Sequence, residues 1–125
     1  MAQSSNRKIA ISFLNLVIQD KVREAYDRYV SQNLIHHNPY FEGTREALFE
    51  AMDADSKENP NKIIDIKMII EEEKLVTIYS HIKQTSDSLG FAAVHIFRIE
   101  NNQIVEMWDV VHVITDDSPN NHGMF

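Results

Sequence analysis

GFAAVHIFRIENNQIVEMWDVVHVI, residues 90–114, contains two mainly apolar runs, Gly90–Glu100 and Gln103–Ile114, joined by two asparagines. Within each run the side chains alternate in polarity, which is typical of a strand with one buried face. Two similar runs, Ile63–Glu71 and Leu75–Thr85, precede them, and all the connections are short and polar. The pattern predicts antiparallel hairpins. Because the runs of nine to twelve residues exceed the usual strand length, we expect a strongly curved or bulged sheet.

Before these runs the apolar spacing is helical. From Arg7 to Val30 apolar residues recur at steps of three and four, which predicts an amphipathic helix capped by Ser5 or Asn6. A single helix of this length would overreach so small a domain. We therefore expect a break at Gln19–Lys21 and a shorter second helix.

The next segment, residues 31–43, has no period, and Asn38 precedes a proline that disfavours helical dihedrals, so we expect an ordered loop. Thr44 can cap a third helix, which Asn59-Pro60 must end. Helices followed by a curved antiparallel sheet predict an α+β domain with the helices packed on one face.

Length and composition restrict the class of protein. The 125 residues suit one domain, 1–125, whose polar segment Asp116–Phe125 we expect to be loose. A formal charge of −7 opposes nucleic-acid binding, and the absence of cysteine excludes disulfides and thiolate chemistry. Because there is no apolar run of about 18 residues and no leader-like segment, we expect a cytoplasmic protein without a membrane partner.

Four segments carry a resemblance to a known family. They are residues 35–39 (IHHNP), 43–47 (GTREA), 95–106 (HIFRIENNQIVE) and 107–112 (MWDVVH). In this order they are similar to the SnoaL-like polyketide cyclases of the nuclear transport factor 2-like superfamily. The resemblance implies a cone-shaped, cystatin-like α+β barrel. In that fold a curved antiparallel sheet wraps around the N-terminal helices and leaves a deep pocket at its open end.

The resemblance also implies an activity. The best-known family members close a polyketide ring by intramolecular aldol condensation, without a metal or an organic cofactor. By likeness, Asp109 is the acid/base and His95 its partner, with a small molecule as ligand and a sheet-to-sheet homodimer as the assembly. Met107 and His112 stand where close relatives have a polar residue and an amide, so we expect a different substrate.

The residues themselves also favour Asp109. Strand alternation puts it on one face with Met107 and Val111, among mostly apolar neighbours. Burial of a carboxyl group raises its pKa toward the range where it exchanges protons near neutrality, for example with the carbon beside a carbonyl. The alternative is a structural aspartate at a strand end, bonded to a loop amide or an arginine.

Histidines supply further candidates. His95 either supports Asp109 from across the pocket or is a buried side chain satisfied by the backbone. Of the adjacent His36 and His37, at most one faces inward, and the family register favours His37. That histidine can equally well serve to structure the proline turn. His81 either lines the cavity or faces solvent.

Four more residues are expected to shape the pocket or its mouth. They are Tyr40, Phe97, Met107 and Trp108. Trp108 lies on the strand face opposite Asp109, so it is also suited to packing against a helix or to a dimer interface. No two histidines have the helical spacing of a zinc site, and we expect no metal.

The competing interpretation is a non-catalytic module for small-ligand binding or dimerisation on the same fold. An enclosed cavity where Asp109 and His95 converge favours the enzyme, and a cavity filled by side chains favours the module. Alternation also places an apolar row on the outer sheet face, where it invites a partner. The residues of this row are Ile64, Ile66, Met68 and Ile70.

Overall fold

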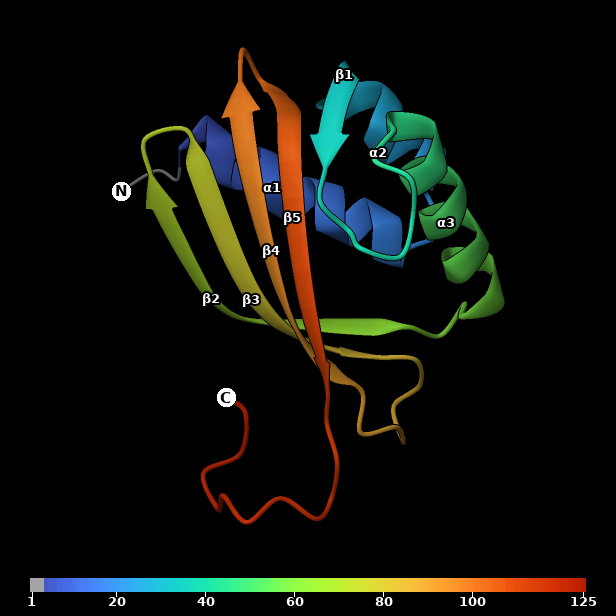
Figure 1. Ribbon diagram of the computed structural model, residues 1–125, viewed down its shortest axis with the longest axis vertical. Coiled ribbons are helices and arrows are strands. Elements are labelled where there is room, and N and C mark those ends of the chain that lie inside the picture. Colours follow the sequence, from blue (N-terminus) through green and yellow to red (C-terminus); the bar gives the residue numbers. More distant parts are fainter. Residues whose placement is uncertain (1–3) are drawn as a thin grey trace.

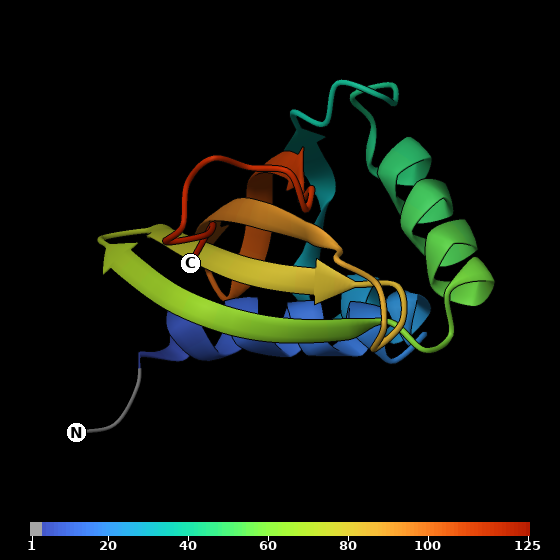
Figure 2. The ribbon, with the colours of Figure 1, turned by 90° about the horizontal axis from the view of Figure 1, so that it is seen from below.

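In the computed structural model, which describes residues 4–125, three helices pack against a five-stranded sheet (Figure 1). The elements are α1 (Ser5–Ile18), α2 (Val22–Tyr29), β1 (Val30–His36), α3 (Arg45–Glu58), β2 (Ile63–Glu72), β3 (Leu75–Lys83), β4 (Phe91–Glu100) and β5 (Gln103–Val113). The strand order is β1-β5-β4-β3-β2, with antiparallel pairing from β2 to β5. The sheet curves over α1 without closing (Figure 2). The predicted α+β class is confirmed.

The helix boundaries follow from local chemistry. α1 and α2 are separated by a tight turn in which Asp20 has a φ of 60°, so the predicted break is confirmed. Ser4 caps α1, rather than either of the two residues after it, and its hydroxyl accepts the Arg7 N–H at 3.1 Å. Thr44 caps α3 as predicted, with its hydroxyl accepting the Ala47 N–H at 3.1 Å.

The first strand corrects the prediction of a loop over residues 31–43. Residues 30–36 form β1, which pairs in parallel with β5 at the sheet edge. Its pairing is irregular between Val30 and Ile35, and its buried residues are Val30, Leu34 and His36. Because the irregular register breaks the two-residue period of burial, the sequence carries no alternation that would indicate a strand.

A β-bulge in β2 corrects the predicted outer face. The register shifts between Ile66 and Met68. The even-numbered residues before Lys67 therefore lie on one face of the sheet, and those after it lie on the other face. Ile66 pairs with Ser80, which is fully buried, and therefore lies on the inner face. Met68 pairs with Tyr79 and is 51% exposed on the outer face. The predicted row is thus split: Ile64 joins the inner side, and Ile70 the outer side.

The core lies between α1 and the concave face of the sheet. Phe13 of α1 packs against Phe97 of β4 and Tyr26 of α2, with ring centroids 5.7 and 5.9 Å apart. Met107 of β5 lies opposite Phe97 and is also buried. This part of the concave face is therefore filled by apolar side chains, whose burial stabilises the fold.

The C-terminal segment, 116–125, continues past the end of β5 and turns back toward the sheet (Figure 1). The Phe125 ring packs on His81 at 4.7 Å and on Tyr79 at 5.3 Å, and the Tyr79 hydroxyl donates to the Met124 carbonyl. The end of the segment that composition predicts to be loose therefore covers part of the outer surface of β3.

Candidate active site

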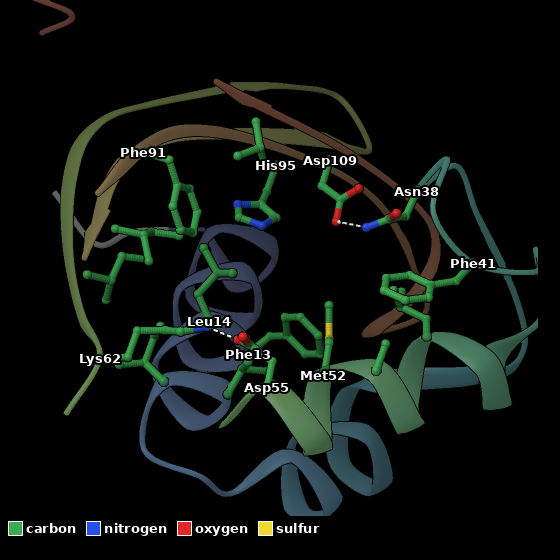
Figure 3. A pocket seen from close by; sticks show the side chains of 17 residues that line it. Phe13, Leu14, Asn38, Phe41, Met52, Asp55, Lys62, Phe91, His95 and Asp109 are labelled. Atoms are coloured by element: carbon green, nitrogen blue, oxygen red, sulfur yellow. Dashed lines mark hydrogen bonds and ion pairs between the residues drawn. The ribbon is translucent and has the colours of Figure 1, made fainter. Parts of the chain in front are cut away.

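A cavity of about 270 Å³ occupies the part of the concave face that the core leaves unfilled. α1 and α3 form one side, and the strands and the β1–α3 loop form the rest (Figure 3). Most of the wall is apolar, with polar groups at two places. The apolar wall includes Phe13, Leu14, Phe41, Met52, Phe91 and Val111, and the polar groups are Asn38, Asp55, Lys62, His95 and Asp109.

Asp109 and His95 both line this cavity. They are directly opposite each other in the β4–β5 ladder, so their side chains leave the sheet on the same face. This corrects one detail of the prediction, in which His95 stands across the pocket from Asp109. The two residues are instead neighbours on adjacent strands (Figure 3). A single small ligand can therefore contact both.

Asn38 orients the Asp109 carboxylate. Its Nδ2 donates to Asp109 Oδ2 at 3.1 Å, and its Oδ1 accepts the Tyr40 N–H at 2.9 Å. The second bond fixes the direction of the amide, because only the carbonyl oxygen can accept from the backbone. Among the hydrogen bonds of residues 4–125, Asp109 Oδ1 has no protein partner, which leaves it available to a ligand. Sequence reasoning used Asn38 only as a sign of a turn and missed this contact.

His95 is buried and incompletely hydrogen-bonded. The side chain is 8% exposed, and within residues 4–125 its Nδ1 has no hydrogen-bond partner. Burial lowers the pKa of His95, the charge of Asp109 opposes this shift, and the charge of Lys62 adds to it. The folded protein therefore favours the neutral imidazole. A buried polar atom without a partner costs stability unless a ligand satisfies it, so this ring fits a binding role.

An ion pair lies on the other side of the cavity. Lys62, just before β2, pairs with Asp55 of α3 (Figure 3). The Lys62 side chain is only 11% exposed, and burial lowers the pKa of its ammonium group. Sequence reasoning did not single out either residue, since a lysine next to a proline turn ordinarily faces solvent.

The prediction that His37 faces inward is wrong, because the buried histidine of the pair is His36. Its Nδ1 accepts the Asn38 N–H at 3.2 Å and its Nε2 contacts the Glu42 carbonyl at 2.5 Å, so Nε2 carries the proton. His37 points outward: its Nε2 lies 2.7 Å from Glu106, and its ring stacks on Trp108 at 5.0 Å. The reason is strand parity, because β1 ends at His36 and the next residue falls on the opposite face.

The other predicted pocket residues do not line the cavity. Tyr40 is 83% exposed, and Trp108 lies on the outer face beneath His37. His81 bonds the Leu89 carbonyl on the outer face. Phe97 and Met107 have the predicted inward orientation, but they are enclosed in the core beside the cavity. Alternation thus gives their face correctly, whereas the limits of the cavity depend on which helix covers each position.

Two kinds of feature are absent from residues 4–125. No group of three or more histidine and acidic side chains is arranged to hold a metal ion. No helix has both the length and the apolar character needed to cross a bilayer.

Similar structures place this fold in a class. AclR, a putative hydroxylase from Streptomyces galilaeus, matches with a TM-score of 0.74 at 16% identity, over 89% of this chain and 91% of that one. A putative polyketide cyclase from Acidithiobacillus ferrooxidans matches at 0.71 and 16%, with the same coverage. A nuclear transport factor 2-like protein of unknown function from Cytophaga hutchinsonii matches at 0.71 and 15%, over 89% and 93%. The protein therefore has the nuclear transport factor 2-like fold.

Within this class the sequence determines the family. The model of the SnoaL-like polyketide cyclases matches residues 8–115, which include all four segments that carry the resemblance. The chain belongs to the SnoaL-like polyketide cyclase family, and the predicted membership is confirmed. No curated protein matches the chain.

Proposed function

We propose that the protein is a cofactor-independent enzyme that performs acid/base chemistry on a small carbonyl compound, by aldol-type cyclisation or by isomerisation. One observation carries the proposal. Asp109, oriented by Asn38, lies beside the buried and incompletely bonded His95 in an otherwise apolar cavity.

The first step is removal of a proton from the carbon beside the carbonyl group. Asp109 Oδ1 accepts this proton, and the C–H electron pair becomes the enolate. The neutral His95 ring donates a hydrogen bond to the enolate oxygen, where negative charge develops. Asn38 holds Oδ2 throughout, so the free oxygen keeps its direction.

The second step returns the proton. In an aldol-type cyclisation the enolate carbon attacks a second carbonyl of the same molecule, a C–C bond forms, and the new alkoxide takes the proton from Asp109. In an isomerisation Asp109 delivers the proton to a different carbon of the enolate system. Both routes leave the enzyme unchanged and need no external oxidant or reductant.

The size of the cavity limits the substrate. A volume of about 270 Å³ is slightly smaller than that of most ligand pockets, which span roughly 300–1,000 Å³. The apolar wall fits a compact hydrocarbon or aromatic body. We infer a compact substrate of one or two rings.

Deuterium exchange tests the chemistry without knowledge of the natural substrate. Small aryl ketones are incubated with the protein in D2O, and NMR follows deuterium incorporation at the carbon beside the carbonyl. Asp109→Asn keeps the shape and removes the proton acceptor, so we expect exchange to fall by a factor of about 10²–10⁴ with the fold intact. Asp27→Asn, on the exposed face of α2, is the matched control. Full exchange by the Asp109 variant would remove this residue from the mechanism.

A second candidate is a non-catalytic ligand-binding or dimerisation module. It is favoured by apolar side chains on the outer sheet surface, where Met68, Ile70 and Val110 are 51%, 61% and 64% exposed. We propose that this surface mediates a cytoplasmic homodimer in either case. Solution scattering measures the mass, and a monomer at high concentration would contradict the assembly. Ligand binding without exchange for any ketone would favour the module.

A further inference from the structure

We propose that the cavity takes carbonyl compounds that also carry a carboxylate, and that Lys62 binds this carboxylate. The inference rests on the proposed function, because it names the substrate class of the same site. It assigns a role to the second polar region of the cavity, on the side away from Asp109 and His95 (Figure 3).

The position of Lys62 is unusual for its side chain. Lys62 lies directly before β2, and its side chain lines the cavity together with Ile64 of that strand. The side chain is 11% exposed, whereas lysine is almost never buried unless its charge is paired. This burial also lowers the pKa of the ammonium group.

The present partner of Lys62 can be exchanged. Asp55 is 50% exposed, so water can solvate its carboxylate when the pair opens. Asn59 Nδ2 also donates to Asp55 Oδ1 at 3.0 Å and remains after the exchange. Lys62 has no comparable access to water. The pair is therefore asymmetric: another anion that enters the cavity can replace Asp55 beside Lys62, and Asp55 then faces solvent.

The positive charge of Lys62 acts on His95, at the polar region where the proposed reaction takes place. Lys62 and His95 line the same cavity, and the charge of Lys62 contributes to the lowered pKa of His95. A ligand that spans the cavity can thus place a carbonyl oxygen near His95 and an anionic group near Lys62. The apolar wall between the two, including Leu14 and Phe91, accommodates the carbon body.

A carboxylate fits Lys62 better than a phosphate does. One ammonium group provides a single positive charge and three donors, and Asp55 stays close by. A phosphate dianion ordinarily requires several cationic or backbone donors, and Lys62 is the only Lys or Arg side chain in the cavity wall formed by residues 4–125. A monoanionic carboxylate matches this limited charge.

The test compares benzoylpropionate with benzoylpropionamide, two aryl ketones of the same shape that differ in charge. Dissociation constants come from NMR titration of the protein near neutral pH. We expect the dissociation constant of the acid to be at least about tenfold lower than that of the amide, because one charge-assisted hydrogen bond has an effect of this size. Lys62→Met, which keeps similar volume, should abolish the difference. Equal binding of the two compounds to the unaltered protein would overturn the inference, as would an unchanged preference in this variant.

Asp55→Asn is a second and independent variant. If Asp55 competes with the ligand for Lys62, its neutralisation should raise the affinity for the acid severalfold and leave the amide unaffected. If the pair only fastens α3 to β2, the variant lowers the unfolding temperature without a gain in acid affinity, and the inference fails. Because this variant retains Lys62, its outcome does not depend on whether Lys62→Met folds.

The outcomes separate this inference from the proposed function. Asp109-dependent deuterium exchange of the neutral amide, together with equal binding of acid and amide, retains the enzyme and rejects the carboxylate site. A Lys62-dependent preference for the acid, with no exchange of either compound, retains the carboxylate site and rejects the enzyme.

Discussion

Two consecutive inward-facing pairs of the β4–β5 ladder have opposite characters. Phe97 and Met107 face each other and are fully buried, with Phe13 of α1 packed against them. One step along the same face, His95 and Asp109 face each other and border a cavity. The His95 ring even stacks on Phe97, with centroids 6.0 Å apart.

The difference comes from what covers each pair, since the strands are continuous through both. α1 packs directly on the apolar pair, whereas the polar pair borders a cavity that is lined by α1, α3 and the β1–α3 loop. Stability and chemistry are therefore adjacent but separable, because side chains fill the space above the apolar pair and a cavity borders the polar pair. Four substitutions test this separation.

The largest effect is expected at the apolar pair. Phe97→Ala should lower the free energy of unfolding by about 3–5 kcal/mol, because it leaves a void beneath Phe13 in a closely packed region. Urea denaturation followed by circular dichroism measures the change. A loss of less than about 1 kcal/mol would mean that the cavity extends beneath this pair and that the boundary between core and site is misplaced.

The next effect is a pH dependence of stability at the polar pair. Burial lowers the pKa of His95, so the folded state holds the neutral ring while the unfolded chain binds a proton near pH 6.5. Stability should therefore be lost as the pH falls below about 6.5, by up to about 1.4 kcal/mol per unit until the folded pKa is reached. His95→Phe removes this term. The unfolding free energies of the unaltered protein and of the His95→Phe variant are compared from pH 8 to pH 5. A constant difference over this range would contradict a buried neutral His95.

A smaller effect is expected at the loop that covers the polar pair. Asn38→Ala removes the donor to Asp109 Oδ2 and should reduce ketone exchange about tenfold, which corresponds to one lost hydrogen bond. Because Asn38 is a positioning residue, the pH profile of exchange should also change, whereas a purely structural loss would scale the rate equally at every pH. NMR in D2O measures both.

The smallest effect is expected one residue earlier, on the outer face. His37→Ala breaks the contact with Glu106, which is partly exposed, and should change the unfolding free energy by at most about 1 kcal/mol. The His37 contact also lowers the pKa of Glu106, so this pKa should rise in the variant. Carboxyl NMR titration reads the pKa, and a value unchanged from the parent protein would show that the contact is absent in solution.

The sequence predicted those features that depend on periodicity. Alternation placed Asp109 and Met107 on one face, and the hairpin order placed His95 on the neighbouring strand. It could not predict the irregular β1 or the bulge at Lys67, because both interrupt the period on which the argument depends. The succession of three helices and four antiparallel strands was predicted correctly apart from the missing β1, since it requires only local patterns.

The missed residues of the site share a different cause. Asn38 and Lys62 lie in connections between elements, where no periodicity fixes the direction of a side chain. Their places beside Asp109 and Asp55 arise from contacts over 71 and 7 positions in the chain. Trp108 and His81 were expected at the pocket or its mouth, but both lie on the outer face of the sheet, which alternation had already indicated for Trp108. The extent of the cavity depends on the distance between the helices and the sheet. No short sequence segment determines that distance.

The adjacent residues His37 and Asn38 contact β5 on opposite faces of the sheet. His37 stacks on Trp108, and Asn38 donates a hydrogen bond to Asp109. Trp108 is the only tryptophan of the chain, and the His37 ring lies parallel to it within 8°. A ligand that draws Asn38 away from Asp109 is expected to disturb this stacked pair, because His37 is the preceding residue in the chain. We therefore expect tryptophan emission from the outer surface to report movement of the loop at Asn38, so that ligands with this effect can be screened without a label.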